Sequence, residues 1–420
     1  ACGASQTGFG RTGTVDWDTS IHTGTVTAAT GKGYFVNTTA GAITVNLPAA
    51  SVGSIVAISD YASTAASNNI TVTPNGSDKI NAINDDYTIS TAGLAVTLVY
   101  ADATRGWKSV TGSDADATGL APAYVVATGG TPCAGATSGD YKIHTFTGPG
   151  TLTVSCGGNA GGSNSIDYLV VAGGAGGGGG PPGGMSNNAA GGGAGGYRES
   201  VPSPAAWTAS PIANPGNARP VTATPYPIAV GGGGAGFPAG GSGGNGTSGG
   251  TSTFSDISSA GGGGGGVLAI TGVPGGSGGG GGTQNALGGT GNDPPVSPAQ
   301  GFPGGTGSPS GPYMGGGGGG ATVIGGAYPC NDGGAGGTTC ISATPTAYAG
   351  GGGGGIGGGP PAPSGGTGGG GAGGACGGTA PSATVNTGGG GGGGGGPAPG
   401  PSKSGGAGGS GIVIIRYKFQ

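Results

Sequence analysis

Charged residues are scarce in this sequence. Of its 420 residues, 11 are Lys or Arg and 15 are Asp or Glu, which gives a formal net charge of −4. Binding to nucleic acid or to an anionic membrane surface requires a concentrated positive patch, so we expect neither as a partner. No apolar run approaches the ~20 residues that cross a bilayer, so we expect no membrane insertion.

Residues that carry out catalysis or bind metals are also rare. The chain has two histidines, His22 and His144, and a single glutamate, Glu199. We interpret both histidines as structural, because His144 lies in an alternating strand pattern and His22 in an ordinary strand or turn. The sequence contains no recognisable paired carboxylates, Ser–His–Asp grouping, zinc spacing or phosphate loop. It therefore predicts no enzyme, no cofactor and no metal site.

Glycine is abundant and unevenly distributed. Of the 119 glycines, 24 precede residue 169, whereas 17 of the 26 charged residues do so. The chain thus combines two architectures. The start lacks the regions of a signal peptide, and we assign residues 1–14 to an amino-terminal segment or linker.

The first architecture is β. Apolar and polar residues alternate at period two in five stretches between residues 33 and 112, and Gly, Pro and Asn-Gly turns separate them. We predict a small β-sandwich-like module over 15–112, followed by a linker over 113–139.

The second architecture is a glycine-rich domain over 140–420, framed by strands in 140–172 and 411–419. "DYKIHTFTGPGTLTVS" has the pattern of a hairpin that turns at Gly148-Pro149-Gly150. "DYLVVAGG" and "GGSGIVIIRY" are apolar strands that adjoin glycine on opposite sides. The sequence predicts that Leu169–Val171 pair with Ile412–Ile415 and so close the domain.

Three structures compete for the glycine islands between these strands. A collagen triple helix requires glycine at every third position, which runs of six to nine glycines violate. A flexible linker would not need the aromatic residues found between the islands. Polyglycine II helices satisfy their backbone groups through neighbouring helices, and glycine permits that close approach. We therefore predict an all-β plus polyglycine II fold, with the nine glycines of 388–396 innermost.

The glycine-rich part resembles a known family. "YLVVAGGAGGGGG", "YPIAVGGGGAG", "GGNGTSGGTSTFSDISSAGGGGGG" and "GGSGIVIIRY" are similar to the glycine-rich domain of phage tail-fibre and other virion appendage proteins of marine, cyanophage-like phages. "GKGYFVNTTAGAITVNLPAA" resembles a β module of such proteins. Their nearest functional analogue is a distal tail adhesin with receptor-binding loops.

This resemblance implies a structural component of a tail or head fibre. It implies a homotrimer that contacts other virion proteins and adheres to a host surface glycan or protein. It also implies assembly in the host cytoplasm and an extracellular virion after release. A glycine-rich cell-surface filament subunit is the alternative. An ice-binding bundle and a soluble enzyme fit the sequence less well.

Binding residues are expected between the glycine islands, because aromatic and Arg side chains are common binding anchors. The alternative role of these residues is to cap the bundle or to pack onto neighbouring subunits. The candidates are Arg198, Trp207, Arg219, Tyr226, Phe302, Tyr313 and Tyr328. Two disulfides are predicted, Cys330–Cys340 across a short interval and Cys133–Cys156 at the start of the hairpin; the alternative is that the cysteines remain thiols.

Overall fold

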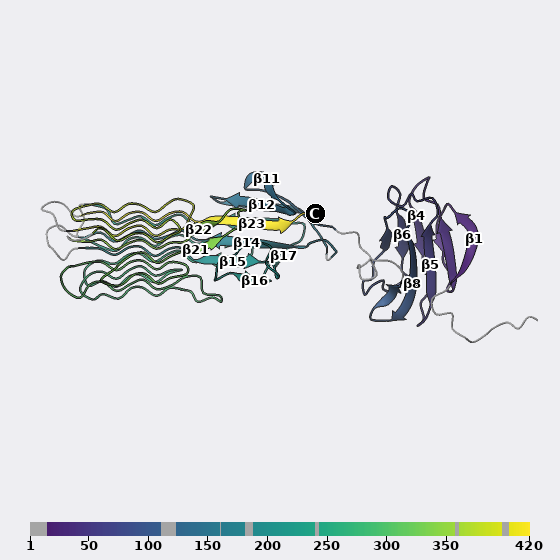
Figure 1. Ribbon diagram of the computed structural model, residues 1–420, viewed down its shortest axis with the longest axis horizontal. Helices are drawn as coiled ribbons and strands as arrows, with labels where there is room; N and C mark the ends of the chain where they lie inside the picture. Colours follow the sequence, from purple (N-terminus) through teal and green to yellow (C-terminus); the bar gives the residue numbers. More distant parts are fainter. Residues whose placement is uncertain are drawn as a thin grey trace, which may run out of the picture. The chain divides into compact units, whose positions relative to one another are not determined.

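The structure is a computed structural model that describes residues 15–110, 123–159, 161–180, 188–239, 243–357, 361–396 and 403–420. This part of the chain is all-β (Figure 1), as predicted. In it, no helix is long and apolar enough to cross a membrane. The chain divides into two compact units, one of 1–123 with 158–163 and one of 124–157 with 164–420. The predicted segment 1–14 lies outside the described residues.

Unit 1 consists of two sheets. Its strands are β1 (Asp16–His22), β2 (Val26–Thr27), β3 (Lys32–Val36), β4 (Ile43–Asn46), β5 (Ile55–Asp60), β6 (Ile70–Thr73), β7 (Tyr87–Ile89), β8 (Ala95–Asp102) and β9 (Gly106–Ser109). The sheet orders are β1-β3-β5-β8-β9 and β2-β4-β6-β7. Strands β1 to β6 alternate between the sheets and pair in parallel within each, and antiparallel β7 to β9 complete them. In the first part of the module, each turn of the chain therefore adds one strand to each of the two sheets.

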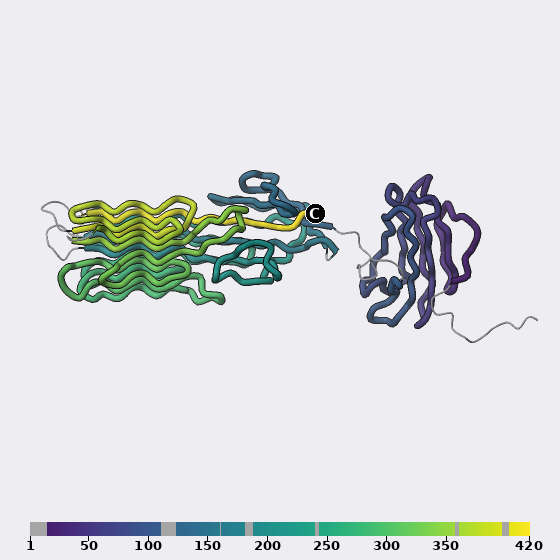
Figure 2. The backbone as a smooth tube through the Cα atoms, viewed as in Figure 1, coloured from purple at the N-terminus to yellow at the C-terminus, as the bar shows by residue number. Residues whose placement is uncertain are grey.

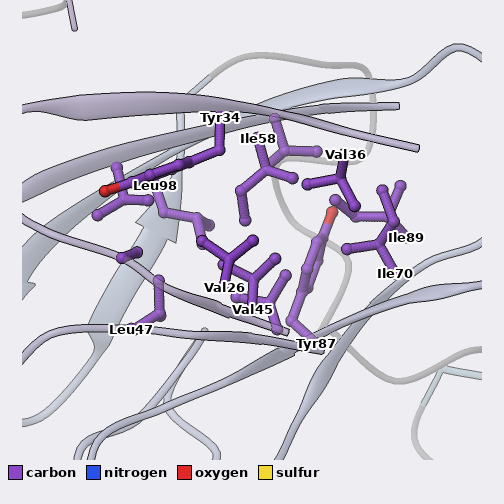
Figure 3. Close-up of a cluster of buried hydrophobic side chains, with 14 of the residues drawn as sticks. Val26, Tyr34, Val36, Val45, Leu47, Ile58, Ile70, Tyr87, Ile89 and Leu98 are labelled. Carbon is purple, nitrogen blue, oxygen red and sulfur yellow. The ribbon is translucent and has the colours of Figure 1, made fainter. Parts of the chain in front are cut away.

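The core of unit 1 lies between these sheets (Figure 3). Strand β4 shows how the sequence builds it, because its alternating pattern buries Ile43 and Val45 and leaves Thr44 and Asn46 partly exposed. Val45, Ile58 and Leu98 have no exposed surface and come from different strands. Removing apolar side chains from water contributes about 25 cal/mol per Å² buried, which stabilises this small module.

Unit 2 contains fourteen strands among its described residues. They are β10 (Val125–Thr128), β11 (Thr131–Ser138), β12 (Tyr141–Phe146), β13 (Gly150–Gly157), β14 (Ser165–Val171), β15 (Tyr197–Val201), β16 (Asn214–Pro215), β17 (Arg219–Pro220), β18 (Pro225–Ala229), β19 (Ser252–Phe254), β20 (Ile257–Ser259), β21 (Gly337–Thr339), β22 (Thr346–Tyr348) and β23 (Ile412–Lys418). The sheet orders are β10-β13-β18-β19-β20, β11-β12-β23-β14-β15-β16 with β17 on β14, and β21-β22.

Strands β14 and β23 form the centre of the larger sheet. They are antiparallel, and Leu169, Val170 and Val171 lie opposite Ile414, Val413 and Ile412, which confirms the predicted pairing. Both faces of these two strands are buried. One face packs on the five-stranded sheet, and the other packs on Ile341 and Tyr348 together with Tyr197 of the adjoining β15, which explains why the two strands are continuously apolar rather than alternating.

The predicted hairpin over 140–155 is wrong. Strands β12 and β13 do not pair with each other, because β12 lies between β11 and β23 while β13 lies between β10 and β18. The turn at Gly148-Pro149-Gly150 therefore carries the chain from one sheet to the other. The range 113–139, assigned to a linker, also contains two strands, β10 and β11.

The glycine islands run beside one another and extend from the sheets (Figures 1 and 2). We call the packed islands the glycine layer. Residues 172, 196, 230, 260, 349 and 411 adjoin strands β14, β15, β18, β20, β22 and β23, and we call this side of the glycine layer the sheet end. The opposite side is the turn end. There Asn188 contacts Tyr313 and Gly396, Ala189 bridges to Val267, and Met314 bridges to Ile356.

Candidate functional site

The glycine layer is held by backbone hydrogen bonds between segments. The segment 172–180 illustrates the pattern, because its amides donate to three neighbouring segments in rotation. Ala172, Ala175 and Gly178 donate to 188–196, Gly173, Gly176 and Gly179 to 243–250, and Gly174 and Gly177 to 403–411. Each neighbour is thus met at every third residue. A strand has a two-residue repeat, so this arrangement differs from a β-sheet.

The glycine run 388–396 is surrounded by other segments in the same way. All nine of its residues are buried. Within the described part of the chain its amides and carbonyls bond to six other segments: 172–180, 188–196, 348–356, 369–374, 378–381 and 403–411. A buried backbone group without a partner is costly, and these neighbours provide the partners on every side.

Glycine is required in this run because other backbone atoms occupy the space of a side chain. A Cβ at Gly392 would overlap the carbonyl oxygen of Ala372 and lie 2.7 Å from its carbonyl carbon. Segments at the rim of the layer have space for side chains. In 403–411, Ser404, Ala407 and Ser410 are only partly buried and recur at every third position. At Gly232, in another rim segment, a Cβ would meet no atom within 4 Å.

Three of the four binding candidates nearest the strands have side-chain partners within the chain. Trp207 lies on the guanidinium of Arg416, with 4.2 Å between the Arg416 Cζ and the ring centroid. Arg219 forms an ion pair with Asp256 at 2.8 Å. Tyr226 packs on Phe254 with centroids 6.2 Å apart, and its hydroxyl accepts from the Thr222 amide. Arg198 is half-buried in β15.

The other candidates lie in the glycine layer. Tyr313 is half-buried at the turn end, and its carbonyl accepts from the Asn188 amide group. Tyr328 is 39% exposed and belongs to the same end, because it precedes Asn331, which donates to Gly315 beside Met314. Phe302 exchanges backbone hydrogen bonds with Gly320 and Gly278. The structure thus separates the candidates between the two ends of the layer.

A buried polar cluster beside β15 was not predicted from the sequence. Glu199 is 2% exposed, and its carboxylate accepts from the Tyr197 hydroxyl, the Ser210 amide and the Thr339 hydroxyl at 2.7, 3.1 and 2.5 Å. It therefore joins β15 to the following loop and to β21. The only sequence signal was that Glu199 is the single glutamate of the chain.

Asp167 and Arg416 extend this cluster. Asp167 accepts from the Ser200 hydroxyl at 2.8 Å, and burial raises the pKa of its carboxyl to about 6. Arg416 donates to the carbonyls of Cys340 and Ile341 at 3.0 and 3.2 Å, and its guanidinium also lies over the Tyr141 ring. These contacts fasten the turn after β21 to the large sheet, so the arrangement is suited to holding loops in place.

The two predicted disulfides are not formed. Cys133, Cys156, Cys330 and Cys340 are free thiols. Cys330 lies in a turn with Ala327, whereas the Cys340 amide donates to Thr208 beyond β21. The nine residues between them run along the layer, and at roughly 3 Å per extended residue they separate the two far beyond the 4.4–6.8 Å of a disulfide. Cys133 and Cys156 belong to strands of different sheets.

Potential metal ligands are dispersed over the chain. Within the described ranges, no group of three or more His, Cys, Asp or Glu side chains is arranged to hold a metal ion. His22 pairs with Asp18 at 3.2 Å on the edge strand β1. His144 is completely buried.

These features define a class of all-β protein in which sheets are continued by a hydrogen-bonded glycine layer. Residues 147–418 match the Glycine-rich domain family, and because this match covers more than half of the sequence, the chain belongs to that family. A comparison with curated proteins found no match.

Proposed function

We propose that the islands of the glycine layer are polyglycine II helices packed as a bundle. The support is the three-residue rotation of hydrogen-bond partners, because a polyglycine II helix has three residues per turn and no internal hydrogen bonds. At ~3.1 Å per residue, the nine glycines of 388–396 span about 28 Å. The bundle is therefore a stiff layer, in which each helix is held by its neighbours.

The proposed function of the chain is structural, as a non-enzymatic component of a phage tail or head fibre. The observation that supports it most is the run 388–396, buried among six other segments. Such a layer provides a rigid support without a large apolar core. The resemblance to virion appendage proteins then gives the setting, which is a virion assembled in the host cytoplasm and extracellular after release.

Adhesion belongs to the same proposal, with a host surface glycan or protein as ligand. Of the candidate residues, Tyr328 at the turn end offers the most accessible ring. The side chains of Trp207, Arg219 and Tyr226 contact other parts of the chain, which favours a role in holding the sheet end together. Tyr328 is therefore the first residue to test for binding.

The adhesion test is competition for host cells. Purified protein should reduce phage adsorption, and Tyr328→Ala should weaken that effect while Val385→Ala, an exposed residue near the sheet end, should not. Equal competition by both variants would remove Tyr328 from the proposal.

Location and assembly state are tested separately. Antibody labelling in electron microscopy should mark an appendage of the virion, and labelling of a cell surface instead would favour the filament-subunit alternative. Native mass spectrometry should give three times the 37.8 kDa chain mass, in contact with other virion proteins when the particle is intact. A species of one chain mass would refute the homotrimer.

A further inference from the structure

The imidazole of His144 lies between the two larger sheets of unit 2 and has no exposed surface. Its Nδ1 is 2.7 Å from the carbonyl oxygen of Gly129, and its Nε2 is 3.0 Å from the hydroxyl of Tyr417. A carbonyl only accepts hydrogen bonds, so Nδ1 carries the proton. Burial favours the neutral ring, in which Nε2 accepts from the Tyr417 hydroxyl.

Tyr417 continues this connection to β10. Its hydroxyl accepts from the Ala127 amide at 3.2 Å, and its ring stacks on His144 with centroids 5.6 Å apart. Gly129 lies where the chain leaves β10 in the five-stranded sheet and enters β11 in the larger one. The side chains of His144 and Tyr417 thus hold the connection between β10 and β11 against β12 and β23.

Strand β11 also packs directly on the imidazole. A Cβ at Gly135 would lie 2.7 Å from Nε2 of His144, so only glycine fits there without displacing the ring or the strand. Both β10 and β11 are at the edges of their sheets, and the β11–β12 register shifts between Thr131 and Ala136. Edge elements with irregular pairing open more readily than central strands.

We propose that His144 is an acid-sensitive latch that holds β10 and β11 on the sheets of unit 2. A protonated imidazole has two donors and no acceptor, so Nε2 no longer accepts from Tyr417, and the Tyr417 hydroxyl is left only the longer contact of 3.4 Å to the Ala127 carbonyl for its own proton. The groups that face the ring are the Tyr417 phenol from β23, the Gly129 carbonyl and Gly135. The nearby ammonium of Lys142, on the same strand, repels a second positive charge. When the connection between β10 and β11 moves away from the sheets, water reaches the charged ring.

The direction of the pH effect follows from burial, which lowers the pKa of His144 below its ordinary value of 6.5. The opened state therefore binds the proton more readily than the closed state. The latch is fully effective above about pH 6.5 and weakens as the pH falls toward the folded-state pKa. Over that window, opening increases by up to about tenfold per pH unit.

Hydrogen exchange measured by mass spectrometry at pH 7.5 and 5.0, and corrected for intrinsic rates, tests this proposal. Peptides covering 123–138 should exchange about tenfold faster at pH 5.0, while β14 remains protected as the internal reference. His144→Gln should abolish the difference, because its amide can still donate to Gly129 but does not titrate. His22→Gln is the matched control and should behave as the unaltered protein.

Equal protection of 123–138 at both pH values would overturn the proposal, as would an unchanged pH difference in His144→Gln. If that variant does not fold, NMR titration of His144 in the unaltered protein decides. His144 must then titrate below the ordinary histidine value of 6.5 and together with the amide signals of β10 and β11. Protonation of His144 without any change in those amides would contradict the latch.

Discussion

The glycine layer leads to a position-specific prediction, that Gly392→Ala is strongly destabilising whereas Gly232→Ala is not. Both residues lie in glycine islands. At Gly392 the new methyl group would overlap the Ala372 carbonyl and lie 3.1 Å from the Ala380 Cβ, whereas at Gly232 it meets no atom within 4 Å. The two substitutions are chemically identical, so they differ only in their surroundings.

The magnitude follows from the hydrogen bonds that the methyl group would separate. Gly392 donates to Pro381 and accepts from Gly406, and displacing these neighbours leaves two or three buried groups unpaired at about 1–3 kcal/mol each. Alanine recovers about 0.4–1 kcal/mol through the unfolded chain. We expect Gly392→Ala to lower the free energy of unfolding by about 3–5 kcal/mol and Gly232→Ala to raise it by up to about 1 kcal/mol.

Thermal unfolding followed by calorimetry measures this difference. At roughly 2 °C per kcal/mol for a domain of this size, the Tm of unit 2 should fall by about 6–10 °C in Gly392→Ala and remain or rise slightly in Gly232→Ala. Unit 1 serves as the internal reference, because its transition should not move. Equal Tm values for the two variants would refute close backbone packing around 388–396.

Three further predictions concern single side chains. The folded-state pKa of Asp167 is raised to about 6 from 3.8, so the stability that this group contributes falls as the pH rises between these values. Asp167→Asn should remove that pH dependence and raise the free energy of unfolding, measured in urea at pH 7.5, by up to about 3 kcal/mol. An unchanged pH dependence would contradict this prediction. Trp207→Ala should lower the free energy of unfolding by about 2–4 kcal/mol through lost packing and the lost contact with Arg416, whereas normal stability with lost host adsorption would indicate a binding role instead. Alkylation in denaturant without reductant should modify Cys133, Cys156, Cys330 and Cys340, and a cross-linked peptide joining either predicted pair would contradict the structure.

The sequence predicted the features that depend on local pattern. The pairing of β14 with β23 could be predicted because both segments are continuously apolar and adjoin glycine, which indicates strands buried on both faces. Strands β3 to β9 of unit 1 could be predicted from the alternation between residues 33 and 112, whereas β1 and β2 precede those stretches. The parallel order of β1 to β6 could not be predicted, because alternation reports which side chains face the core and not which strand is the neighbour.

The failed predictions depend on contacts between distant residues. Gly148-Pro149-Gly150 indicates a turn, but the same signal serves a hairpin and a change of sheet. Strand β12 pairs with β11 and with β23, which is far along the chain. The interval between Cys330 and Cys340 resembles a short loop, yet it is a pass along the glycine layer. Likewise, the sequence does not reveal whether an aromatic residue falls at the sheet end, like Trp207, or at the turn end, like Tyr328.

The cluster around Glu199 illustrates the same limit. A lone glutamate in a sequence poor in charge signals a special position, but its donors come from β15, from the loop that follows it and from β21, 140 residues away. Only the folded chain brings them together. The buried Asp167 was hidden for the same reason, because its neighbours in the sequence do not explain its raised pKa.

Amide exchange by NMR, on protein labelled with 15N at glycine, tests most directly whether the glycine islands form an ordered, hydrogen-bonded layer. We predict that most glycine amides of the layer, including those of 390–395, survive for hours in D2O, as the amides of β14 do. Complete exchange of the glycine signals within minutes, while β14 stays protected, would contradict the hydrogen-bonded layer.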